Sequence, residues 1–332
     1  MPPTSSQGLN RRSALGVVSV GAALPLVAAP NVALAQGTPA VARGQSEALF
    51  IAGKSVTPIP FAEWEAAATG AEASGAPLRI VQGKDKVDKA PANAARYESK
   101  RYDFPSGSFR VLTFKKGGPV LHQIGLETEI LVLQGSVMLT PLFGVKSLSA
   151  TLGASDAISM LGGTLRNPKP TEDTVLLLAQ VAANKAGAKG SIVYGKDVVS
   201  AETVQWVADG KEMSARTPEE AKAAPANAAR YVAKRYVFDG NSLRYVTLRK
   251  GDKTNTAVTS RTDVIIYVPK GRMRRIEGDQ TFDMVAGDAV REKVGNPGHW
   301  EMLEDSVFIA TDAPLLPATF APTMAAAGGM LK

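Results

Sequence analysis

A segment that occurs twice constrains the fold of this 332-residue chain more than any other feature. Residues 90–117, APANAARYESKRYDFPSGSFRVLTFKKG, return without a gap as residues 224–251, APANAARYVAKRYVFDGNSLRYVTLRKG. An earlier landmark is repeated too, because Trp64 follows Gly53-Lys54 at the spacing at which Trp206 follows Gly195-Lys196. A long internal repeat indicates that one structural unit has been copied. The sequence therefore predicts two similar units in tandem.

The first 35 residues are typical of an export signal. Arg11-Arg12 precede an apolar run, and Ala33-Leu34-Ala35 provides the small residues that a signal peptidase needs. The paired arginines resemble a twin-arginine signal. The apolar run is interrupted by prolines and is shorter than the roughly 20 residues that cross a bilayer. We expect cleavage between Ala35 and Gln36, a periplasmic mature protein, and no membrane association once the signal is removed.

Composition excludes several classes of function. The chain has no cysteine, which excludes disulfides, thiolate metal sites and thiol catalysis. Its net charge of +7 includes Arg11 and Arg12, and no run of lysine and arginine with interleaved aromatics is present. Nucleic acid is therefore not an expected partner. A small-molecule ligand is the expected partner instead.

Both copies have β patterning after the repeated octapeptide. Residues 108–114 and 242–248 are rich in β-branched, aromatic or alternating apolar residues, and each run ends at a Lys-Gly turn. Further strands are expected at 129–133, 136–139, 174–181, 264–268, 272–276, 280–285 and 306–310. Many short strands separated by Gly, Pro, Asn and Asp predict an all-β chain, built as an antiparallel sandwich or barrel.

Short helices are expected ahead of the two β regions. One is predicted around Phe61–Glu65, with Pro60 at its first position, and another at Thr217–Ala224, where Thr217 precedes Pro218 as a cap. The expected organisation is a signal peptide at 1–35, a lead-in at 36–89, a first domain at 90–185, a helical lead-in and second domain at 186–313, and a tail at 314–332.

Two stretches in each copy carry a family resemblance. In the second copy, residues 285–289 (VAGDA) and 295–300 (GNPGHW) follow a strand-to-glycine segment at 262–271, and residues 117–122 and 130–135 occupy similar places in the first copy. These stretches resemble the motifs of the cupins, in particular the two-domain bicupins. The resemblance covers about residues 95–182 and 229–313. It implies two tandem cupin-like antiparallel β-barrels of the double-sheet jelly-roll kind, with short helical segments before each.

The resemblance also implies where a metal site would lie. Cupins usually hold a metal with two histidines one residue apart, a glutamate and a third histidine. The matching positions here are His122, Ile124, Thr128 and a place near Arg166 in the first copy, and Thr256, Val258, Thr262 and His299 in the second. A slip of one residue would put Glu127 or Glu129 beside His122. Two ligands are too few for tight binding, so no cofactor is expected. The alternative is a single Fe, Mn, Ni or Zn ion.

The candidate ligand-pocket residues are His122, Thr128, Glu129, Arg110, Arg244, Thr256, Thr262 and His299. Arg110 and Arg244 recur at the same place in the repeat and either form a carboxylate clamp or lie outside in surface ion pairs. His299 either faces a pocket or packs beside Trp300. The first hypothesis is an exported module that binds a small polar ligand, a sugar or a carboxylate, in a barrel interior. The second is a cupin lyase, isomerase or dioxygenase with His122 as metal ligand or acid/base, and the third is a purely structural pair of barrels. A homodimer is a possible assembly in each case.

Overall fold

The computed structural model describes residues 49–65, 78–117, 128–141, 150–159, 166–181, 190–209, 211–215, 217–226, 228–254, 262–277, 279–294 and 298–313. The predicted signal segment at 1–35 and the predicted tail at 314–332 lie outside these residues, as do His122 and Thr256. Within the described ranges, no helix is long and apolar enough to span a bilayer.

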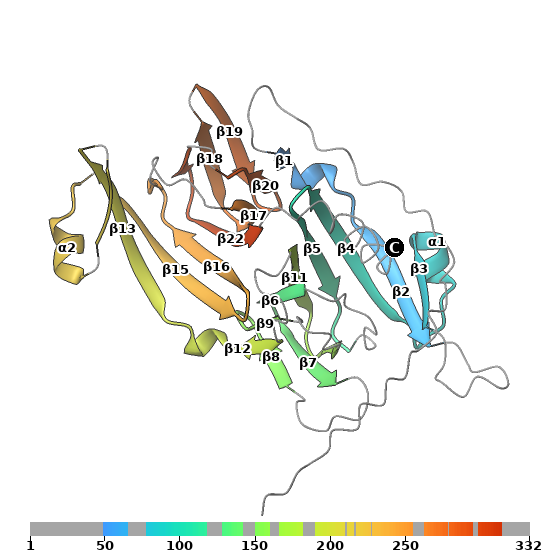
Figure 1. The fold of residues 1–332 in the computed structure, drawn as a ribbon. Helices are drawn as coiled ribbons and strands as arrows, with labels where there is room; N and C mark the ends of the chain where they lie inside the picture. Colours follow the sequence, from blue (N-terminus) through green and yellow to red (C-terminus); the bar gives the residue numbers. More distant parts are fainter. Residues whose placement is uncertain are drawn as a thin grey trace, which may run out of the picture. The chain divides into compact units, whose positions relative to one another are not determined.

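Two antiparallel sheets form the first barrel. Its strands are β2 (Ile59–Glu65), β3 (Leu78–Gln82), β4 (Ala95–Phe104), β5 (Gly107–Phe114), β6 (Thr128–Gln134), β7 (Ser136–Pro141), β8 (Ala150–Gly153), β9 (Ala157–Ser159), β10 (Arg166–Pro170), β11 (Thr174–Val181) and β12 (Ser191–Val193). The large sheet has the order β12-β9-β6-β11-β5-β4-β2-β3, and the small sheet has the order β10-β7-β8. Helix α1 (Lys84–Asp88) follows β3 and precedes β4 along the chain. In Figure 1, strands β5, β4, β2 and β3 run side by side.

The second barrel repeats this arrangement. Its strands are β1 (Leu49–Ile51), β13 (Ser200–Ala208), β14 (Lys211–Ser214), β15 (Ala229–Phe238), β16 (Asn241–Leu248), β17 (Asp263–Lys270), β18 (Arg272–Glu277), β19 (Gln280–Val285), β20 (Ala289–Glu292), β21 (His299–Met302) and β22 (Ser306–Ala313). The large sheet has the order β1-β20-β17-β22-β16-β15-β13-β14, and the small sheet has the order β19-β18-β21. Helix α2 (Pro218–Ala223) precedes β15. The prediction of an all-β chain is therefore confirmed.

Alternation along the strands decides which side chains fill which core. On β5, Leu112 and Phe114 face the small sheet of their own barrel, whereas Phe109 and Val111 face the other barrel. Side chains alternate in the same way along β15, so that Tyr236 lies on one face of the strand and its neighbours Arg235 and Val237 lie on the other. Each barrel thus has its own interior, and a third core lies between the two large sheets.

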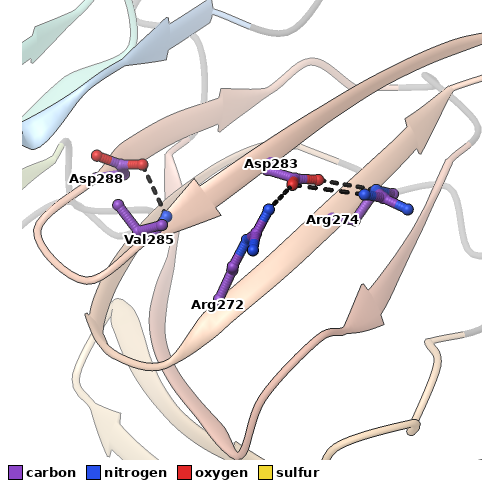
Figure 2. A network of polar contacts seen from close by, with 5 residues as sticks. All are labelled: Arg272, Arg274, Asp283, Val285 and Asp288. Atoms are coloured by element: carbon purple, nitrogen blue, oxygen red, sulfur yellow. Dashed lines mark hydrogen bonds and ion pairs between the residues drawn. The ribbon is translucent and has the colours of Figure 1, made fainter.

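The first strand of each repeat pairs with a strand of the other barrel. Strand β1 pairs with β20, and β12 pairs with β9. The 3-10 turns that follow, Gly53–Ser55 and Gly195–Asp197, are held in the same way. The Gly53 amide donates to Asp288 Oδ1 at 2.7 Å, and the Gly195 amide donates to Asp156 Oδ1 at 2.7 Å. The other oxygen of Asp288 accepts from the Val285 amide, as Figure 2 shows.

Close backbone approach at these turns explains the repeated glycine. A Cβ atom at Gly53 would lie 2.1 Å from the Gly287 carbonyl oxygen, and one at Gly195 would lie 2.3 Å from the Ser155 carbonyl oxygen. The same two carbonyls accept hydrogen bonds from the hydroxyls of Tyr102 and Tyr236, respectively. The repeated glycine and tyrosine are therefore among the residues that join the two barrels.

The helix predicted around Phe61–Glu65 is wrong. Residues Ile59–Glu65 form strand β2, which pairs with both β3 and β4. Pairing with two strands satisfies the backbone of β2 and buries Phe61 and Glu63, so that tertiary contacts override the local helical signal. The second predicted helix is confirmed as α2, because Thr217 Oγ1 accepts from the Glu220 amide and Pro218 occupies the first turn.

Candidate functional site

A cavity of about 640 Å³ lies in the interior of the second barrel. The large sheet contributes alternate residues of β13, β15 and β16, and the small sheet contributes Arg275 and Trp300. The segment at 197–199, which follows β12, also borders it. Val199 and Val237 are 82% and 63% exposed, so that this end of the cavity is open to solvent. A cavity of this size is typical of a small-molecule site.

The polar lining comes from several different strands. Its charged and hydrogen-bonding side chains are Asp197, Thr203, Gln205, Tyr231, Arg235, Arg244, Thr254, Arg275 and Glu292. The remaining wall is mainly valine, isoleucine, alanine, phenylalanine and tryptophan. A largely apolar wall with a few convergent polar groups is the usual composition of a ligand pocket.

Arg275 is held rigidly at the small-sheet side of the cavity. Its Nε lies 3.0 Å from Glu277 Oε1, and its Nη1 lies 2.6 Å from Glu292 Oε1. Glu292 also accepts from Trp300 Nε1 at 2.8 Å, and the guanidinium stacks over the Trp300 ring at 5.1 Å. Gly298 permits this packing, because a Cβ there would lie 2.5 Å from the Arg275 guanidinium. The network presents a fixed wall in which one guanidinium group is shared by two carboxylates.

Arg244 is less constrained and lies on the large-sheet side. Its Nη2 donates to Asp312 Oδ1 at 2.9 Å, and its side chain is 36% exposed. Its Nε is buried and has no hydrogen-bond partner among the described residues. Burial raises the pKa of the neighbouring Tyr231 hydroxyl, against the opposing effects of Thr203 and Arg244. Arg244 therefore keeps unused hydrogen-bonding capacity beside the cavity.

Arg110, the counterpart of Arg244, lies in the interior of the first barrel. It is 6% exposed, donates from Nε to Ser99 Oγ at 2.7 Å, and packs over the rings of Phe61 and Tyr97 at 5.4 and 5.8 Å. The Tyr97 hydroxyl donates to Glu63, and burial raises the pKa of Tyr97. Arg110 and Arg244 thus line different interiors, and the structure does not bring them together as one clamp.

Two further candidates from the sequence lie on β6. Glu129 is 1% exposed and faces the second barrel, near Thr311 and Asn241. Burial raises the pKa of its carboxyl to about 8, against the opposing effects of Thr311 and Asn241, while Asp312 adds to the rise. The backbone of Thr128 pairs with Gln180. Glu129 is accordingly placed between the barrels and outside the lining of the cavity.

The remaining candidates do not meet at the cavity. Thr262 immediately precedes β17 and is partly exposed. His299 alternates with the inward-facing Trp300 on β21, so its side chain lies on the outer face of the small sheet, where its Nε2 is 3.9 Å from Glu301 Oε1. Burial lowers the pKa of His299. The predicted positions of His122 and Thr256 lie outside the described residues.

A metal ion does not fit the described part of the chain. There, no group of three or more histidine, aspartate and glutamate side chains is close enough to share an ion. Around His299 the available set is one imidazole and the Glu301 carboxylate, which also pairs with Lys253. Two ligands, one of them already paired with a cation, do not make a tight divalent site.

Sequence reasoning missed Arg235, Arg275 and Glu292. A signal was present in the differences between the repeats. Arg275, four residues after Gly271, corresponds to the buried Leu139, four residues after Gly135. A charged residue that replaces a core leucine on an inward-facing strand position indicates a polar site in one copy only.

Comparison with known proteins gives a likeness in structure alone. No protein-family model and no curated protein matches the sequence. A putative glyoxylate-induced protein from Pseudomonas aeruginosa aligns with a TM-score of 0.51 at 11% identity, over 85% of this chain and 94% of that chain. The pirin YhhW from Escherichia coli, solved with nickel(II), gives 0.49 at 11% identity over 81% and 100% of the two chains. A cupin 2 conserved barrel domain protein from Leptotrichia buccalis gives 0.40 at 12% identity over 68% and 93%.

The likeness to the glyoxylate-induced protein concerns the fold alone, because an identity of 11% is far too low to carry activity across. In the described residues, each barrel pairs an antiparallel eight-stranded sheet with a three-stranded sheet around one interior. The chain accordingly folds as two tandem antiparallel β-barrels.

Proposed function

We propose that this protein is exported to the periplasm and binds a small polar ligand, a sugar or a carboxylate, inside its second barrel. The observation that carries the proposal is the cavity of about 640 Å³ with Arg244 and Arg275 on opposing sheets. Guanidinium groups are well suited to carboxylates and hydroxyls because they donate several hydrogen bonds in a fixed plane. The enzyme alternative depends on His122, and no contact among the described residues favours it.

Export is tested with the signal segment. Replacing Arg11 and Arg12 with lysines is expected to leave the precursor in the cytoplasmic fraction, because the paired arginines are the feature that resembles a twin-arginine signal. Cell fractionation of the wild type and the double variant measures this. Equal amounts of mature protein in the periplasm would contradict the twin-arginine route.

Ligand binding is tested by filling the cavity. Thr203→Phe introduces the side chain that Phe61 supplies at the equivalent place in the first barrel, where β2 and β13 make the same register with β4 and β15. We expect at least one compound in a panel of monosaccharides, sugar acids and small carboxylates to raise the thermal midpoint of the wild type, because a ligand stabilises the state to which it binds. The shift should disappear in Thr203→Phe.

Thr203→Ser is the matched control, since it keeps the hydroxyl without filling the cavity and should keep the shift. A compound that stabilises Thr203→Phe as strongly as the wild type would bind elsewhere and would contradict the proposed site. A complete panel without any shift would contradict the proposed ligand class.

A further inference from the structure

Three equivalent positions on the large sheets differ between the two barrel interiors. Each of these differences either makes the second interior larger or removes a charge from it. Strand register makes Phe61 the counterpart of Thr203 and Glu63 the counterpart of Gln205, because each pair faces the same repeated residues on β4 and β15. Ser99 on β4 corresponds in the same way to Ala233 on β15. In the first barrel these side chains are buried around Arg110. Their counterparts Thr203, Gln205 and Ala233 line the cavity in the second barrel.

The same comparison explains why Arg235 and Arg244 lack the hydrogen-bond acceptors that their counterparts use in the first barrel. Arg101 and Arg110 face each other across β4 and β5, as Arg235 and Arg244 do across β15 and β16. In the first barrel, Arg101 Nε is 2.7 Å from Asp103 Oδ1 and Arg110 Nε is 2.7 Å from Ser99 Oγ. The repeat replaces both of these acceptors.

Val237 occupies the place of Asp103, and Ala233 that of Ser99. Arg244 Nε is consequently without a hydrogen-bond partner among the described residues, although Nη2 keeps Asp312. The Arg235 side chain forms no ion pair or hydrogen bond within the described ranges. Two guanidinium groups thus share one wall of the cavity. Asp312 pairs with Arg244 alone, and Asp197, which also lines the cavity, pairs with Lys196.

Like charges directly opposite each other on an antiparallel pair are destabilising. Glu277 and Glu292 both pair with the third lining arginine, Arg275. An anion bound between Arg235 and Arg244 would reduce the repulsion between these two guanidinium groups. The charge pattern therefore favours an anionic ligand group at this end of the cavity.

Much of the remaining wall favours an apolar ligand body, although Thr203, Gln205, Tyr231 and Thr254 also line the cavity. Its apolar part includes Val246, Val264, Ile266, Phe308 and Ala310. The open end is apolar too, because Val199 and Val237 are exposed there. Burying hydroxyl groups against such a surface without partners is costly, whereas burying an apolar body is favourable.

We propose that the second barrel binds a small organic acid, a molecule with one carboxylate or sulfonate group on an apolar body, with Arg235 and Arg244 holding the anionic group. This inference rests on the proposed function and narrows its ligand class. It selects an amphipathic anion over a sugar.

The test uses two fluorescent probes that differ by a single sulfonate group. The anion is 8-anilinonaphthalene-1-sulfonate, and its neutral counterpart, N-phenyl-1-naphthylamine, has the same apolar body without the sulfonate. We expect the anion to bind the wild type at least tenfold more tightly than the neutral probe. Arg235→Gln and Arg244→Gln should each weaken the anion about tenfold to a hundredfold, the range for loss of a charged hydrogen bond, and leave the neutral probe within about twofold.

Arg101→Gln in the first barrel is the matched control and should change neither affinity. Arg235→Gln keeps the test decisive if Arg244→Gln is unstable, since Arg235 is exposed. Equal binding of both probes, insensitive to either arginine but abolished by Thr203→Phe, would overturn the organic-acid inference and leave ligand binding in the barrel intact. Probe binding that Thr203→Phe does not change, or no binding of either probe, would overturn the inference and the proposed site together.

Discussion

Replacing Arg275 with methionine is expected to destabilise the protein by about 3–5 kcal/mol, the usual cost of breaking a buried ion pair from one side. Arg275 is 4% exposed and is the cation of a network that holds Glu277 and Glu292. Methionine fills much of the same volume beside Trp300 but leaves both carboxylates without their cation. The free energy of unfolding from denaturant titration, monitored by Trp fluorescence, measures the effect.

The matched control lies on the opposite face of the same strand. Arg272 and Arg274 both reach Asp283, as Figure 2 shows, but the Arg272 side chain is 46% exposed. We expect Arg272→Met to lower the free energy of unfolding far less than Arg275→Met does, because water screens surface ion pairs. Adding Glu277→Gln and Glu292→Gln to Arg275→Met should recover part of the loss. Equal free energies of unfolding for Arg275→Met and Arg272→Met would contradict the claim that the buried ion pairs of Arg275 stabilise the fold.

Replacing Glu129 with glutamine is expected to stabilise the protein near neutral pH by an amount on the order of 3 kcal/mol. The Glu129 carboxyl is buried between the barrels, and burial raises its pKa to about 8 from the ordinary value of 4.5. The folded protein therefore holds this proton more tightly than the unfolded chain does. Glutamine keeps the shape of the side chain and removes the cost of keeping the acid neutral.

The sign of the pH dependence follows from the raised pKa. Below about pH 4.5 the carboxyl is protonated in both states, and wild type and Glu129→Gln should differ little. Between about pH 4.5 and 8 only the unfolded chain releases the proton, so wild-type stability falls by about 1.4 kcal/mol per pH unit relative to the variant. Above pH 8 the difference becomes constant. Thermal or denaturant unfolding of both proteins from pH 4 to pH 9 measures this divergence.

Glu98→Gln is the control, because Glu98 is an exposed carboxylate on β4 and should give no pH-dependent gain. A constant difference between wild type and Glu129→Gln across the whole pH range would show that the carboxyl is not kept neutral by the fold. A divergence that grows toward acidic pH would have the opposite sign and would contradict the raised pKa.

Much of the fold was predictable because its signals are local. The alternation in 108–114 and 242–248 predicted the strands observed as β5 and β16. The cap at Thr217 and Pro218 predicted α2, since a helix start depends on a few adjacent residues. The repeat predicted two similar units, and the cupin resemblance predicted paired sheets around each interior.

The candidate site was only partly predictable. Arg244 was selected because it recurs in the repeat, yet its copy Arg110 is sealed in a filled interior while Arg244 borders a cavity. Phe61 looked helical from its neighbours along the chain, but pairing with β3 and β4 makes it a strand residue that fills the first barrel.

The sequence alone thus determined that the chain is a duplicated all-β protein without thiol chemistry, since periodicity, turns and composition are properties of neighbouring residues. Only the tertiary structure decided that β1 and β12 cross between the barrels and that Phe61 is matched by Thr203. It also decided that the second interior combines a cavity with the guanidinium groups of Arg235 and Arg244. Empty volume and unpaired charge depend on which distant side chains meet, and that is settled by packing rather than by local pattern.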